Sequence, residues 1–175
     1  MRLGYLVTHP IQCQAPLFKR VANMKNVDFK VYYQSDTGVR EKYDPNFQIK
    51  FAWDIPLLDG YDYEFIPSLG SNSNIGTLWP FAYDMGKRLK RDGMDVLWIH
   101  GYSRPSHWNA IFQAKHNGMK ILLRDEAHLN AQKRGAFKLI VKELMLNRMF
   151  RYIGKFFGNW HMECCILSSL WGAGE

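Results

Sequence analysis

The chain has 175 residues, which is enough for one sizeable domain and short of two ordinary ones. Apolar residues make up 47% of the chain and aromatic residues 15%, which supports a real hydrophobic core and argues against disorder. The formal net charge of +7 is uneven, because residues 1–86 carry a net −1 and residues 87–175 a net +8. The basic half would attract a phosphate-bearing substrate, an acidic glycan, nucleic acid or an anionic membrane surface.

The cysteines and the apolar runs indicate a cytoplasmic protein. Cys13, Cys164 and Cys165 are odd in number, two of them are adjacent, and no metal-binding spacing occurs, so a reducing compartment is the simpler prediction. The run Leu3–Val7 is too short for the core of a signal peptide, and no apolar stretch approaches the roughly 20 residues of a membrane span. Peripheral contact with the inner membrane face stays open.

The first half of the chain predicts a strand, a helix and a second strand. Leu3–Val7 lacks polar alternation, as a fully buried strand does. Pro16 suits the first turn of a helix that carries Leu17, Val21 and Met24 on one face. A second strand over Asp28–Gln34 then favours a right-handed parallel crossover. The less regular stretch that follows is expected to hold two short strands and a flexible loop, at Lys50–Trp53, Tyr61–Ile66 and Ser68–Gly76.

The second half alternates helices and strands. We expect helices over Leu78–Arg91, from Pro105 to Asn117-Gly118 and over Ala136–Phe150. We expect strands over Asp95–Ile99 and Lys120–Leu123, and the start of another strand at Arg151–Gly154. Thr77 and Ser103 are candidate helix caps, whereas His107 and His116 read as ordinary surface or cap residues. The predicted fold class is α/β, a Rossmann-like three-layer sandwich with a mostly parallel sheet over residues 1–155. Residues 156–175 form an atypical tail with no clear period.

Three predicted strands end in short polar clusters, at His9–Gln14, His100–Tyr102 and Arg124–His128. Ligands of open α/β sheets bind beyond the carboxyl ends of the strands, so the clusters predict one shared site. Histidine can orient a hydroxyl or carbonyl group, arginine can grip a phosphate or carboxylate, and glycine allows close approach. The candidate binding residues are His9, Gln12, Gln14, His100, Gly101, Tyr102, Arg124 and Glu126.

Plainer interpretations of these clusters remain open. The glutamines of the first cluster would equally cap a helix, His100 would be a core histidine bonded to backbone, and Arg124 would pair locally with a carboxylate. Cys13 has no evident base beside it and is expected to be simply packed. The loop spacing gives no support for a metal site, and the absent G-x-G-x-x-G pattern argues against a wrapped dinucleotide.

A row of basic residues is predicted on a helix toward the C-terminus. Arg134, Lys138 and Lys142 are spaced four residues apart on the predicted helix over Ala136–Phe150. The row is either a solvated stripe on a mostly buried helix or a contact with an anionic membrane or lipid phosphate. No recognised nucleic-acid-binding motif is present, so nucleic acid is not expected as a partner.

Four of these segments together resemble the N-terminal domain of GT-B glycosyltransferases of the large retaining family 4. They are Gly4–Gln12, Ala15–Phe18, Asp95–Gly101 and Leu122–Glu126, and the stretch Asp44–Gly60 resembles one branch of the group. The resemblance covers about residues 1–155. It implies one half of an architecture in which two Rossmann-like domains face each other across a cleft.

The resemblance also implies roles for the candidate residues. His100 would help to form the catalytic centre, the His9–Gln14 loop would border the acceptor and donor phosphates, and Arg124 and Glu126 would line the same cleft. A nucleotide sugar would be a substrate, and no metal or other cofactor is implied. The acceptor would be a glycan or a lipid-linked molecule, and the donor would bind only with the missing C-terminal domain.

The sequence thus predicts the acceptor-side half of a glycosyltransferase, moving a sugar from a nucleotide-sugar donor to a hydroxyl acceptor in glycan biosynthesis. Without the donor domain it is expected to be inactive alone, as a truncated or frameshifted chain, and whether it acts as an enzyme stays open. Two alternatives accompany this prediction. One is a free-standing binding module for an anionic ligand or a partner subunit, and the other is a non-functional fragment.

Overall fold

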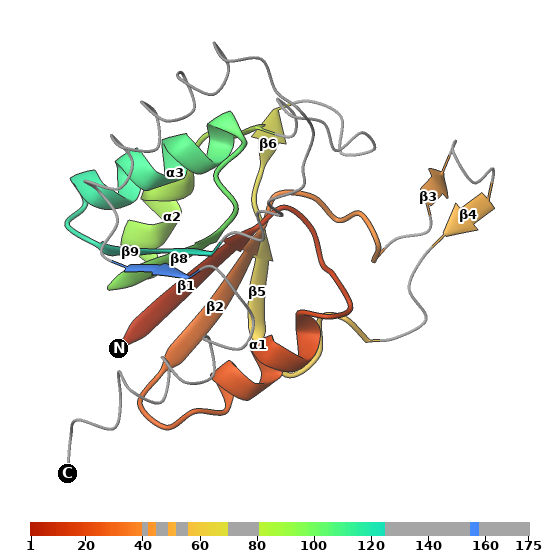
Figure 1. Cartoon of the computed structure of the whole chain (residues 1–175), viewed down its shortest axis with the longest axis horizontal. Coiled ribbons are helices and arrows are strands. Elements are labelled where there is room, and N and C mark those ends of the chain that lie inside the picture. The colour runs from red at the N-terminus through yellow and green to blue at the C-terminus, as the bar shows by residue number, and fades with distance from the viewer. Residues whose placement is uncertain (40–41, 45–48, 52–55, 70–80, 125–154, 158–175) are drawn as a thin grey trace.

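The computed structural model describes residues 1–39, 42–44, 49–51, 56–69, 81–124 and 155–157. Its main feature is a six-stranded sheet in the order β10-β9-β8-β1-β2-β5 (Figure 1), in which every neighbouring pair is parallel. The strands are β1 (Arg2–Val7), β2 (Asp28–Tyr33), β5 (Asp62–Phe65), β8 (Val96–His100), β9 (Lys120–Arg124) and β10 (Lys155–Phe157). Two antiparallel pairs are separate from it: β3 (Lys42–Asp44) with β4 (Ile49–Phe51), and β6 (Ser68–Leu69) with β7 (Phe81–Ala82).

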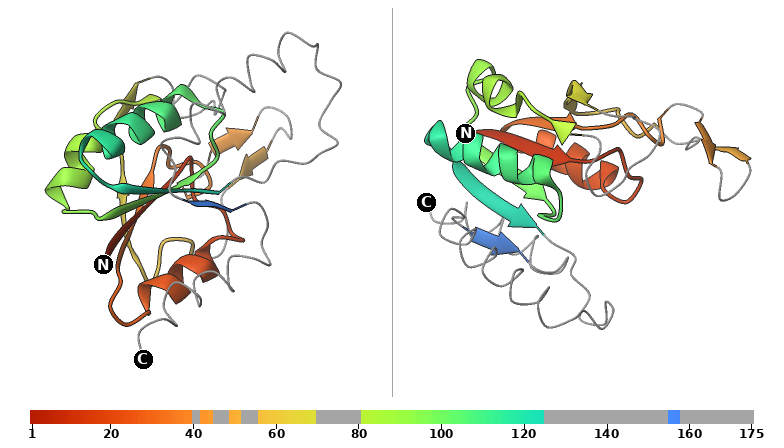
Figure 2. Two further views of the ribbon diagram at one scale, coloured as in Figure 1. Left: turned by 60° about the vertical axis from the view of Figure 1, so that its left-hand side comes forward. Right: turned by 90° about the horizontal axis from the view of Figure 1, so that it is seen from above.

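Helices cover both faces of the sheet. Helix α1 (Ala15–Ala22) lies on one face, and α2 (Met85–Arg91) and α3 (Pro105–His116) lie on the other, as both views in Figure 2 show. The predicted Rossmann-like three-layer α/β fold with a parallel sheet is therefore confirmed.

Alternate residues of β1 pack on opposite faces, which explains its continuous apolar run. Tyr5 joins the buried cluster on the α1 side, where its ring centroid lies 4.8 Å from that of Phe18. Leu6 joins the cluster on the other side with Met85 of α2 and Ile111 of α3. A strand of a parallel sheet with both faces covered needs apolar side chains in both directions. The central strand is thereby fixed between two cores.

Some predicted elements need correction. The helix expected from Leu78 begins at Met85, because Phe81–Ala82 forms β7 and pairs with β6 instead. Arg104, not Ser103, occupies the N-cap position of α3, and it makes no side-chain cap bond.

In α1 the buried aromatic side chain is Phe18, whereas Leu17 is only half-buried and Met24 lies past the end of the helix. The helix over Ala136–Phe150, the capping role of Thr77 and most of the C-terminal tail lie outside the described residues.

Strand β10 carries the sheet slightly further than expected. It includes Phe156 and Phe157, two residues beyond the domain boundary predicted at residue 155. None of the described helices is both long enough and apolar enough to cross a membrane. The basic row predicted to meet a membrane falls outside the described residues.

Asp92 joins β2 to the C-terminal end of α2. Its carboxylate accepts hydrogen bonds from Lys30 Nζ at 2.9 Å, Tyr32 Oη at 2.6 Å and Arg91 Nε at 2.6 Å. The hydrogen bond from Arg91, followed by those from Tyr32 and Lys30, holds the pKa of Asp92 well below its usual range. The ionised carboxylate therefore stabilises the folded state.

We expect Asp92→Asn to lower the free energy of unfolding by about 1–2 kcal/mol at pH 7, since charged hydrogen bonds are lost. A carboxyl group with a lowered folded pKa stabilises the fold above its unfolded pKa of about 4 and loses that effect as the pH falls further. The gap between wild type and variant should therefore shrink below pH 4 in urea unfolding. Asp28→Asn is the control, because Asp28 is 70% exposed in its pair with Arg2. Equal losses in both variants would contradict this role of Asp92.

Candidate functional site

The predicted clusters follow strands on both sides of the point where the strand order of the sheet reverses. From β1 the chain passes through α1 to β2 on one side, whereas β8 lies on the other side and leads through α3 to β9. Because α1 and α3 cover opposite faces, the loops that leave β1 and β8 diverge (Figure 1). This switch point, beyond the carboxyl ends of the strands, is the usual ligand site of open α/β sheets.

His100, the last residue of β8, is bonded to both sides of this switch point. Its Nδ1 lies 2.8 Å from Gln14 Nε2, just before α1, and 3.0 Å from Tyr5 Oη on β1. An amide nitrogen only donates hydrogen bonds, so Nδ1 is the acceptor and the proton of the neutral imidazole lies on Nε2. The fold thus fixes the position of His100 and, with the Gln14 amide in this orientation, favours the tautomer protonated on Nε2.

Arg124 brings the third cluster to the same edge. It is the register partner of His100 in the parallel pair of β8 and β9, and its carbonyl accepts from Gly101 N at 2.7 Å. Aligned residues of neighbouring strands face the same side of a sheet. The Arg124 side chain is buried, with 1% of its surface exposed. The strands that precede residues 9, 100 and 124 are parallel neighbours in the sheet, so their carboxyl ends lie at the same edge.

Arg104 sets the electrostatics of this rim. Burial, and then the positive charge of Arg104, lowers the pKa of His9. Burial also lowers the pKa of His107 to about 3, with the charges of Arg104 and His100 adding to the effect. Both imidazoles are therefore neutral at pH 7. The expectation that His107 is a surface or cap residue is wrong, because only 2% of its surface is exposed beside Gly101.

The other predicted site residues lie in different settings. Gln12 and Cys13 are exposed on the loop between β1 and α1. Tyr102 is half-buried, and its carbonyl accepts from Trp108 Nε1 at 2.8 Å. Gly101 has φ +85°, a backbone conformation that favours glycine. Glu126 lies outside the described residues.

Sequence analysis missed Gln34 and Ser106 as site residues. Ser106 Oγ, in the first turn of α3, donates to Gln34 Oε1 at 3.0 Å, and each residue is 1% exposed. Gln34 follows β2, and its backbone N–H donates to the Val7 carbonyl at the end of β1. The signal that identified the other clusters, a polar residue directly after an apolar strand, also applies to Gln34.

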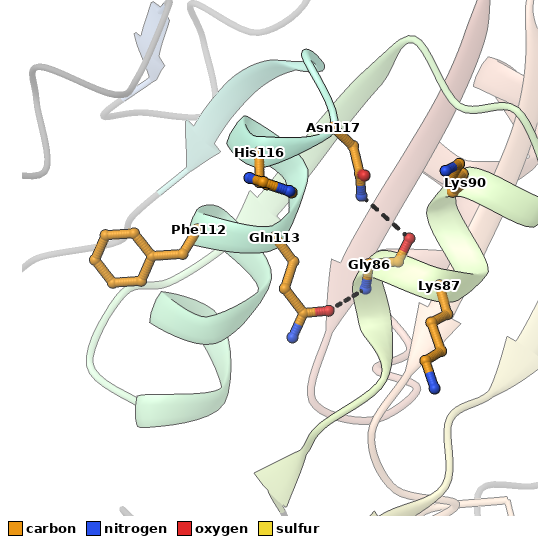
Figure 3. Close-up of a pocket in the computed structure, with 7 residues that line it drawn as sticks. All are labelled: Gly86, Lys87, Lys90, Phe112, Gln113, His116 and Asn117. Atoms are coloured by element: carbon orange, nitrogen blue, oxygen red, sulfur yellow. Dashed lines mark hydrogen bonds between the residues drawn. The ribbon is translucent and has the colours of Figure 1, made fainter.

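A groove of about 480 Å³ lies between α2 and α3, away from this rim (Figure 3). It is lined by Gly86, Lys87, Lys90, Phe112, Gln113, His116 and Asn117, none of which belongs to the predicted site. Gly86 N donates to Gln113 Oε1, and Asn117 Nδ2 donates to the Gly86 carbonyl at 3.3 Å, so these contacts hold the two helices together. Within the described residues, no group of three His, Cys, Asp or Glu side chains could hold a metal ion.

The comparisons of this sequence with known proteins found no match. No protein-family model matches the chain. No curated protein matches it either. Among solved structures, an isochorismatase-like hydrolase from Alkaliphilus metalliredigens matches over 89% of this chain and 94% of that one, with a TM-score of 0.47 and 11% sequence identity. At that TM-score and identity the match carries no argument about the activity of this chain.

The resemblance to GT-B glycosyltransferases has to be corrected. No family model and no curated protein supports it, and a solved structure that matches over 89% of the chain is described as an isochorismatase-like hydrolase. The prediction of an acceptor-side half of a sugar transferase is therefore withdrawn, because none of the three comparisons bears it out. The physical reason lies in the motifs, since a buried strand that ends in a His-Pro or His-Gly turn suits the edge of any parallel α/β sheet.

We expect Arg104→Gln to raise the pKa of both His9 and His107. A nearby positive charge disfavours the imidazolium form, so removing it makes protonation easier, while burial still holds both values below 6.5. Histidine titrations followed by NMR would measure the shift. Lys87→Gln, in the groove between α2 and α3, is the control and should leave both values unchanged. Unmoved His9 and His107 titrations in Arg104→Gln would contradict the proximity of these charges.

Proposed function

We propose that the protein binds a small, oxygen-rich polar molecule at the switch point between β1 and β8, with His100 Nε2 as a hydrogen-bond donor. The observation that carries the proposal is the shared bonding of His100 Nδ1 to Gln14 and Tyr5. These contacts join the loop before α1 to the end of β8. They favour the tautomer of the ring in which Nε2 carries the proton.

Preorganisation supports a binding role for this histidine. Immobilising a side chain on binding costs about 0.5–1.5 kcal/mol, and a ring already held by two hydrogen bonds avoids most of that cost. Tyr5 is itself fully buried and packs edge-on against Trp98 with ring centroids 5.0 Å apart. The support for His100 therefore extends into the core, as a ligand-binding side chain requires.

The charges of the rim favour a ligand with acceptor oxygens. Arg104 is half-buried beside His9 and His107, whose imidazoles are neutral at pH 7, and buried Arg124 lies in register with His100. Arginine side chains only donate hydrogen bonds. Sugar hydroxyls, sugar phosphates and nucleotides all offer oxygen acceptors, so these classes are the proposed ligands.

The test is an NMR titration of the full chain with a panel of monosaccharides, sugar phosphates and nucleoside monophosphates. We expect at least one class to bind and to shift the ring signals of His100. His100→Ala should weaken that binding about tenfold, the effect of losing roughly 1.4 kcal/mol of hydrogen bonding. His116→Ala is the matched control, because His116 is exposed in the last turn of α3.

Two results would contradict the proposal. One is a panel in which no ligand perturbs the residues around His100. The other is a ligand that binds His100→Ala as tightly as it binds the wild type.

A further inference from the structure

We infer that the N-terminus of α3, together with Gln34, forms a subsite for an oxyanion, the phosphate or carboxylate group of the bound ligand. This inference rests on the proposed function for the rest of the ligand, but the subsite is testable with inorganic phosphate alone. It extends the site from His100 across the switch point to the end of β2.

The start of α3 carries partial positive charge from the helix dipole. A helix leaves its first backbone N–H groups without intrahelical partners. In α3, Pro105 has no N–H and His107 N donates to the Arg104 carbonyl at 3.1 Å, so the N–H of Ser106 is the group that this end offers to a ligand. The capping residue Arg104 makes no side-chain cap bond, and the first turn of α3 contains no acidic side chain. Oxyanions bind well at such helix ends.

Gln34 supplies the second, independent observation. Its Oε1 accepts from Ser106 Oγ at 3.0 Å, which places the amide against the first turn of α3. Its Nε2 is buried and has no hydrogen-bond partner in the part of the chain that the structure describes. A buried donor without a partner destabilises the folded state, so such a group calls for an explanation. An anionic oxygen at the start of α3 would accept this hydrogen bond.

The charged groups around the start of α3 favour a ligand with negative charge. Arg104 immediately precedes α3, and after burial its positive charge is the next cause that lowers the pKa of His9 and of His107. A cation would be repelled by Arg104 and by the helix dipole, and would find no acceptor in the Gln34 NH₂ group. An oxyanion would gain from all three, so the chemistry of the donors commits the subsite to a phosphate or carboxylate.

The experiment titrates the full chain with inorganic phosphate at constant ionic strength and follows the Ser106 backbone amide and the Gln34 side-chain amide by NMR. We expect saturable shifts of both signals. Gln34→Leu should weaken phosphate binding at least tenfold. Gln34→Glu, which keeps the side-chain length and places a carboxylate at the start of α3, should weaken it further and guards against a folding defect in the first variant.

Matched variants separate this subsite from its alternatives. Lys115→Gln removes an exposed charge in the last turn of α3 and should leave phosphate binding unchanged, whereas diffuse attraction to basic residues would weaken in it. Acetate in place of phosphate shows whether a carboxylate also binds. The inference would be overturned if the wild type showed no saturable shifts. It would also be overturned if both Gln34 variants bound phosphate as tightly as the wild type does.

The outcome is also distinct from that of the proposed function. His100→Ala should retain phosphate binding at Ser106, because His100 is not part of the subsite. If phosphate still binds to His100→Ala but no ligand of the panel depends on His100, the subsite stands and the proposed function is rejected. If a panel ligand depends on His100 but phosphate does not bind at Ser106 and Gln34, only the subsite is rejected.

Discussion

The parallel pairing of β1 with β2 on one side and β8 on the other is the constraint on which the rest of this structure depends. From β1 the chain continues through α1 to β2 on one side, whereas β8 lies on the other side of β1 and continues through α3 to β9. Helices α1 and α3 therefore cover opposite faces of the sheet. The carboxyl ends of β1, β8 and β9 then lie at one edge, where polar side chains far apart in sequence come together. A parallel sheet buried on both faces has no polar surface of its own, so its strand ends are where polar chemistry gathers.

His100 connects that topology to the chemistry of the site. Its Nδ1 contacts Tyr5 from the core of β1 and Gln14 from the loop that follows β1. Arg104 and Arg124 place positive charge around the same rim, and burial keeps His9 and His107 neutral. Together these groups make a rim of hydrogen-bond donors. The Nε2 donor of Gln34, which has no partner among the described residues, extends this rim to the start of α3. A ligand rich in oxygen acceptors is what such a rim can hold.

Much of this arrangement could be predicted from the sequence, because buried strands read as apolar runs and the first polar residue after each run marks the sheet edge. This signal singled out Gln14, His100 and Arg124, and in the structure Gln14 contacts His100 while Arg124 is its register partner. It could not reveal the contact between Gln34 and Ser106, which are 72 residues apart and meet only through the packing of α3 on the sheet. The glycosyltransferase prediction failed for a related reason, since short strand-end motifs report a fold type more than a reaction.

The most direct test of this account is the tautomer of His100, read from its ring ¹⁵N chemical shifts at neutral pH in the full chain. The account predicts an unprotonated Nδ1 that accepts hydrogen bonds and a protonated Nε2. The Gln14→Leu variant should weaken this preference, because one of the two side chains bonded to Nδ1 is lost. A proton on Nδ1 in the wild type would contradict the account, since Gln14 would then face His100 with its carbonyl oxygen and Nε2 would be no donor to a ligand.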